Sequence, residues 1–168
     1  PLRLVGSEMC IRDRAYAQVQ NVVQRRADLI PNLVNTVKGY SDYEGETLTK
    51  ITEARSGINN AKSPKELADA NDQLTQAVRE MNVVVENYPE LKANTQYTQL
   101  MDELAGSENR ISVERGNYNQ AVKNYNTDLN RFPTNIIAGF TGYKEAEYFQ
   151  ASEGAQEAPK VDFNQNNK

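Results

Sequence analysis

Apolar side chains return every seven residues through most of this 168-residue sequence, and this spacing constrains the fold more than any other feature. A helix turns once in 3.6 residues, so positions seven apart share a face, and each series predicts a helix with one apolar stripe. The spacing therefore predicts an all-α fold of long helices. The three series are Val23, Ile30, Val37, Ile51 and Ile58, interrupted by Glu44; Leu67, Leu74, Met81 and Tyr88; and Tyr97, Leu104, Ile111, Tyr118, Tyr125 and Phe132.

Prolines and capping residues mark the ends of these helices. Ser63-Pro64-Lys65-Glu66 has the spacing of a capping box, in which the Ser63 hydroxyl accepts from the Glu66 amide and the Glu66 carboxylate returns to the Ser63 amide. Pro89 and Pro133 follow the second and third series, and the residue before a proline avoids helical angles. We expect long helices over 32–57, 64–88 and 95–132, and a short one over 134–140.

Pro31 lies inside the first apolar series, where it removes a backbone donor and clashes with the carbonyl four residues earlier. Val23 and Ile30 continue in phase as Val37, and no glycine-rich turn surrounds the proline. We therefore predict a kink rather than a reversal of direction. Segments 32–57 and 64–88 would be rods of roughly 38 Å that match as a hairpin. The expected architecture is an up-and-down four-helix bundle of three long antiparallel helices plus a short C-terminal helix.

Composition excludes several kinds of site. The net charge of -4 argues against nucleic-acid binding, which needs a clustered positive field. The chain has no histidine and one cysteine, Cys10, which excludes a Cys/His zinc site, a Ser-His-Asp triad and an internal disulfide. A carboxylate-only site for magnesium or calcium remains possible, but no loop has the Asp-rich spacing of an EF-hand. We expect no catalytic residues, no metal and no cofactor.

The chain divides into three segments by pattern. Residues 1–14 lack the seven-residue spacing, and Val5–Arg14 looks like a translated sequencing adapter, so we expect residues 1–14 to be a non-native or disordered lead. Residues 15–149 carry the pattern of a helical bundle. Residues 150–168 read as a polar C-terminal tail.

A run of apolar residues outside the heptads is the strongest interaction candidate. Glycines punctuate it, and it either covers the end of the bundle or contacts a protein partner or a membrane surface. Its residues are Ile136, Ile137, Phe140, Tyr143, Tyr148 and Phe149.

Polar groups on the predicted helices are open to two interpretations each. Arg25 and Arg26, with Asp28, form either a partner-binding charge patch or a solvated helix face. Tyr118-Asn119 and Tyr125-Asn126 form either a ladder that faces a ligand or buried rings with wet hydroxyl groups.

Carboxylates give two further candidates. Glu108, with Asn109 and Arg110, belongs either to a buried polar network or to weak surface pairs. Clustered Glu44, Glu46 and Glu53 would be the carboxylates of a hydrolase, or they face water.

Several stretches in order resemble the LemA family over Ala15–Phe163. They are Gln24–Tyr40, Tyr88–Asn94, Glu108–Ile111 with the two Tyr-Asn pairs, Phe132–Phe140 and Pro159–Phe163. The resemblance implies a bacterial four-helix bundle anchored to the cell membrane by one N-terminal helix that this chain does not contain. It leaves the side of the membrane open and offers no catalytic residues to carry over.

The resulting functional expectation is a membrane-anchored, non-enzymatic helical domain that binds an unknown protein partner. Two alternatives remain open at this point. One is a carboxylate-based hydrolase, and the other is a soluble oligomeric coiled coil, which the long third heptad series allows.

Overall fold

The computed structural model describes residues 2–40, 45–131 and 134–149, and over these ranges the chain is helical without a strand. The all-α class is therefore confirmed. The helices are α1 (Leu2–Asp28), α2 (Ile30–Tyr40), α3 (Glu46–Asn60), α4 (Pro64–Val85), α5 (Pro89–Lys92), α6 (Thr95–Leu129) and α7 (Thr134–Thr141).

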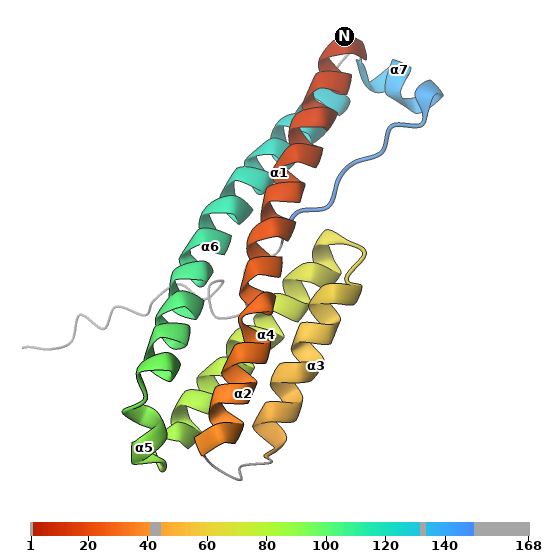
Figure 1. Ribbon diagram of the computed structural model, residues 1–168. Coiled ribbons are helices and arrows are strands. Elements are labelled where there is room, and N and C mark those ends of the chain that lie inside the picture. The colour runs from red at the N-terminus through yellow and green to blue at the C-terminus, as the bar shows by residue number, and fades with distance from the viewer. Residues whose placement is uncertain (1, 41–44, 132–133, 150–168) are drawn as a thin grey trace, which may run out of the picture.

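Successive long helices run in opposite directions (Figure 1). α1 and α2 descend together, α3 returns, α4 descends beside it, and α6 rises along α1. The closest pairings are α1 with α6 and α3 with α4. The short helix α7 lies at the end of the molecule where α1 begins (Figure 1). An extended segment then leads back from α7 toward the middle of the α1–α6 pair.

The single rod predicted over 32–57 is wrong, because α2 ends at Tyr40 and α3 begins at Glu46. Gly39 and Gly45 flank this break, and each glycine weakens a helix by about 1 kcal/mol relative to alanine. Gly45 is the extended residue that caps α3, with φ of -97° and ψ of 162°. The helix that pairs with α4 is therefore the 15-residue α3. The short helix α7 follows the long helices in the chain.

The predicted kink at Pro31 is confirmed. α1 ends at Asp28, Leu29 forms a turn, and α2 continues in the same direction from Ile30 (Figure 1). Pro31 lies in the first turn of α2, where a backbone donor has no partner within the helix. The Leu33 amide still donates to the Leu29 carbonyl over 3.1 Å, so backbone bonding resumes directly after the proline.

The seven-residue series form the core. Nearly all of their members are buried, while Tyr88 is half-buried and Phe132 lies outside the described residues. A second, smaller cluster closes the end of the molecule near α7. It is made by Val5, Tyr125, Leu129 and Ala138.

Residues 2–14 are helical, whereas the sequence suggested a non-native or disordered lead. Val5 is 1% exposed in the second cluster, and the Arg12 guanidinium lies 4.7 Å from the centroid of the Tyr125 ring. Gly6 has the lowest helix propensity in this stretch, and no proline interrupts residues 2–14. Helix α1 can therefore extend upstream of Ala15. The foreign origin of these residues stays a prediction.

One of the two hydrogen bonds predicted for the capping box at the start of α4 is confirmed. Ser63 Oγ accepts from the Glu66 amide over 3.2 Å, and Pro64 takes the first helical position. The Glu66 carboxylate turns to the Lys62 amide over 2.8 Å instead of the Ser63 amide. Together these bonds hold the loop between α3 and α4.

We predict that Ser63→Ala lowers the free energy of unfolding by about 1 kcal/mol, because the Glu66 amide loses its capping acceptor. Urea denaturation followed by circular dichroism measures the change. The control is Ser112→Ala, at an exposed position inside α6, which should leave stability unchanged or slightly raised. Equal midpoints for Ser63→Ala and the wild-type protein would contradict the role of this cap.

Candidate functional site

The extended residues 143–149, here called the strap, lie along α6 and bond to the two Tyr-Asn pairs, here called the ladder. In the first rung, the Tyr125 hydroxyl donates to the Lys144 carbonyl over 2.9 Å. The Asn126 amide group donates to the Ala146 carbonyl over 3.2 Å and accepts from the Ala146 amide over 2.9 Å. One asparagine thus satisfies both backbone groups of Ala146.

The second rung repeats the first with the same chemistry. The Tyr118 hydroxyl donates to the Glu147 carbonyl over 2.9 Å. Asn119 donates to the Phe149 carbonyl over 3.0 Å and accepts from the Phe149 amide over 2.8 Å. Every one of these bonds goes to the strap backbone, so the ladder recognises an extended chain and not particular side chains.

The spacing of the two rungs explains why the bonds repeat. Seven residues of α6 rise roughly 10.5 Å, and three residues of extended chain span roughly 10 Å. The rungs are seven residues apart on α6 and three apart on the strap, from Ala146 to Phe149. A seven-residue helical repeat and a three-residue extended repeat are therefore nearly commensurate.

Side chains of the strap add packing to these bonds. Phe149 is 1% exposed in the main core, and Tyr143 and Ala146 pack partly buried on the second cluster. On the ladder, burial raises the pKa of Tyr118 to about 12, so its hydroxyl stays protonated and can donate at neutral pH. The tyrosine rings are buried, as one sequence interpretation expected, but their hydroxyl groups donate to the strap instead of facing water. The ladder therefore binds a segment of the same chain.

The C-terminal interaction candidates separate into two groups. Phe149 and much of Tyr143 cover the helices, while Ile136, Phe140 and Tyr148 are 52%, 89% and 46% exposed. The Ile137 side chain lies outside the described residues. Ile136 and Phe140 therefore form an exposed apolar face on α7 that a partner could reach.

Arg26 and Arg25 have opposite environments. Arg25 is exposed, whereas Arg26 is 3% exposed. The Arg26 Nη1 atom donates to Asn71 Oδ1 over 2.9 Å and to Thr75 Oγ1 over 2.7 Å, and it lies 2.6 Å from Glu108 Oε2. The interpretation of Arg26 as part of a solvated face is therefore wrong. The Arg26 side chain joins α1 to α4 and α6.

The surroundings of Arg26 are those of a buried cation that contacts the Glu108 carboxylate directly, with Asp72 as a further acidic neighbour. Burial lowers its pKa, and the nearby Glu108 carboxylate opposes that effect. The Glu108 side chain is 36% exposed at a groove of about 460 Å³ between α4 and α6, so water reaches it. Asn109 and Arg110 are exposed, and only Glu108 of that trio enters the buried network.

Sequence reasoning missed Asn71 and Thr75, the two α4 members of this network. The signal was present, because Asn71 lies four residues after Leu67 and three before Leu74 and so falls on the apolar stripe of α4. A polar residue on such a stripe needs a partner from another helix. The asparagine thus indicated a buried network before its partners were known.

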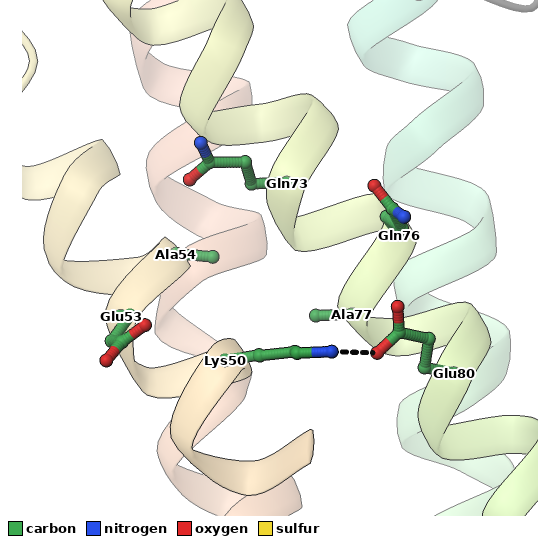
Figure 2. A pocket seen from close by; sticks show the side chains of 7 residues that line it. All are labelled: Lys50, Glu53, Ala54, Gln73, Gln76, Ala77 and Glu80. Atoms are coloured by element: carbon green, nitrogen blue, oxygen red, sulfur yellow. Dashed lines mark hydrogen bonds and ion pairs between the residues drawn. The ribbon is translucent and has the colours of Figure 1, made fainter. Parts of the chain in front are cut away.

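Of the carboxylates proposed for a hydrolase, the two that the structure describes, Glu46 and Glu53, do not gather in one site. Lys50 lies 3.6 Å from Glu46 on its own helix. It also lies 3.1 Å from Glu80, reaching from α3 to α4 across a pocket of about 320 Å³ (Figure 2). Glu53 lies apart from that pair (Figure 2), and Glu44 lies outside the described residues. Among the described residues, no group of three or more acidic or cysteine side chains could hold a metal ion.

We predict that Asn126→Ala and Asn119→Ala each release one rung. Each variant leaves an amide and a carbonyl of the strap without partners, at a cost of about 1 to 3 kcal/mol. Amide hydrogen exchange measured by NMR should speed up at Ala146 for the first variant and at Phe149 for the second. The matched control is Gln120→Ala, an exposed amide side chain on the same helix. Wild-type exchange at both amides would show that the ladder does not hold the strap.

We also predict an asymmetry between the two ends of the buried ion pair. Glu108→Gln removes the carboxylate that contacts a 3%-exposed cation and should lower the free energy of unfolding by about 3 kcal/mol. Arg26→Met should cost less, because the carboxylate that remains can be hydrated. Guanidinium denaturation gives both values, with Glu103→Gln on the exposed side of α6 as control. The reverse order would contradict the burial argument.

Comparison with known proteins places this helical arrangement in a family. The LemA family profile matches residues 15–163. Protein LemA of Metamycoplasma hominis is 33% identical over 83% of this chain and 64% of its own length. Magnetosome protein MamQ 2 of Paramagnetospirillum magneticum is 28% identical over 77% of this chain and 57% of its own.

A shorter match, 31% identical, links 51% of this chain to 31% of magnetosome protein MamQ of Magnetospirillum gryphiswaldense. All of these matches therefore leave a third or more of the relative's length outside this chain. The names of these relatives state no enzymatic reaction. The family match begins at Ala15 and includes the kink, the ladder and the strap. The chain therefore belongs to the LemA family.

Proposed function

We propose that this chain is a non-enzymatic helical domain that is tethered to a bacterial membrane and holds a protein partner there. The exposed apolar face of α7 is the observation that carries the proposal. Phe140 is 89% exposed and Ile136 is 52% exposed on a helix without a charged residue. Large apolar side chains grouped in this way are typical of contact surfaces.

The location of α7 favours a contact at one end of the molecule. α7 lies beside the start of α1, where Leu4 is 58% exposed (Figure 1). The strap connects α7 to the centre of the α1–α6 pair through the ladder. A partner bound at α7 would therefore be held on a rigid helical rod rather than on a loop.

The membrane part of the proposal rests on family membership and on the length of the relatives. In the described ranges, none of the helices has the length and hydropathy needed to cross a bilayer. The match to the Metamycoplasma hominis protein covers 64% of that protein, so the relative has further sequence. The proposed tether is a transmembrane helix upstream of Ala15, as the family resemblance implies.

We predict that Ile136→Asp and Phe140→Asp abolish crosslinking of the full-length protein to its partner in bacterial membranes. A charge placed on the α7 face should disfavour an apolar contact while leaving the core intact, because both side chains are exposed. Val113→Asp is the matched control, since Val113 is 62% exposed on α6, away from the α7 face.

Circular dichroism establishes that each variant is folded. Folded α7 variants that retain every crosslinked partner would place the contact elsewhere. Metal-dependent turnover that Glu46→Gln or Glu53→Gln abolishes would contradict the non-enzymatic assignment.

A further inference from the structure

We propose that the ladder on α6 also binds the strap of a second copy of this chain, so that two copies associate by exchanging residues 143–149. Each copy carries both the binding site and its ligand. The proposal is independent of the partner contact at α7. It follows from what the ladder recognises and from how the strap is attached to the rest of its own chain.

The ladder makes all of its hydrogen bonds described above to one short segment, the strap. All six bonds from Tyr118, Asn119, Tyr125 and Asn126 go to backbone atoms between Lys144 and Phe149. A strap from another copy can make the same six bonds and bury the same Phe149 ring. Exchange therefore preserves these contacts, and its main cost is the entropy of association and of turning the strap away from its own α6.

A glycine lies at the junction between α7 and the strap. Of the α7 side chains that the structure describes, only Ala138 is buried, while Ile136, Phe140 and Thr141 are exposed. Gly142 ends α7 with φ of 79°, a left-handed conformation that glycine adopts without strain. The strap, residues 143–149, can therefore leave α6 by turning at Gly142 while α7 stays in place.

Concentration decides between the closed and exchanged forms. A strap tethered to its own ladder has an effective concentration on the order of a millimolar, so dilute protein stays closed. Crowding of copies, for example at a membrane surface, shifts the balance toward exchange. The two forms have the same ladder bonds and differ in which chain supplies the strap.

Complementation between two full-length variants tests the proposal. One variant, Asn119→Ala/Asn126→Ala, keeps its strap and lacks the ladder amides. The other, Ala146→Pro/Phe149→Ala, keeps the ladder and has a strap that cannot donate at 146 or fill the core at 149. Sedimentation velocity should find each variant monomeric alone and a one-to-one dimer in the mixture. Two differently labelled samples of the ladder variant, mixed as a control, should stay monomeric.

A second measurement covers the case in which a double variant fails to fold. A fluorescent peptide of residues 143–149 is titrated with the full-length single variant Phe149→Ala, and anisotropy is recorded. We expect saturable binding that weakens about tenfold or more when Asn126→Ala is added to the same chain, because two hydrogen bonds are lost.

Three results would overturn the proposal. The first is a mixture of folded variants that stays monomeric at high protein concentration. The second is peptide binding that is absent or unaffected by Asn126→Ala. The third is a wild-type dimer that persists unchanged in the full-length Phe149→Ala chain, which would place self-association on another surface.

Discussion

The buried Arg26 cation is the interaction on which the arrangement of the helices depends. A guanidinium group that is 3% exposed must keep its partners, and these come from two helices other than its own. Sliding α6 by one turn past α1 would separate Arg26 from Glu108 by about 5.4 Å. Apolar stripes alone tolerate such a slip, because one layer of leucine and valine resembles the next. The polar contact thus selects one register among several that hydrophobic burial permits.

That register determines where the ladder lies. Tyr118 and Tyr125 belong to the same seven-residue series as Leu104 and Ile111, so the stripe that buries the core also aims the tyrosines at the strap. The adjacent asparagines lie at the edge of the stripe, where they reach the strap backbone. Core packing and strap binding consequently depend on the same seven-residue spacing. A change in the register of α6 would alter both.

The parts of this structure that the sequence predicted are those governed by local rules. Heptad burial, the kink at Pro31 and the Ser63 cap depend on neighbours within about one turn of helix. The break between Tyr40 and Glu46 was missed because apolar residues keep their phase across it and outweighed Gly39 and Gly45. Arg26 was misjudged because it follows Arg25, and only contacts with distant helices distinguish the two side chains. The Tyr-Asn repeat was visible, but an aperiodic strap gives no sign of what the repeat binds.

The near-match between seven helical residues and three extended residues has a consequence for how this segment can evolve. Because the ladder bonds to the strap backbone, the exposed side chains of Lys144, Glu147 and Tyr148 are little constrained by folding, whereas Glu145 accepts a hydrogen bond from the Asn130 side chain. The number of residues between Ala146 and Phe149 is constrained, since one insertion would leave a rung empty. The length of the strap is thus constrained, while its exposed side chains can vary. The chemistry of this surface can therefore change while the helices beneath it stay the same.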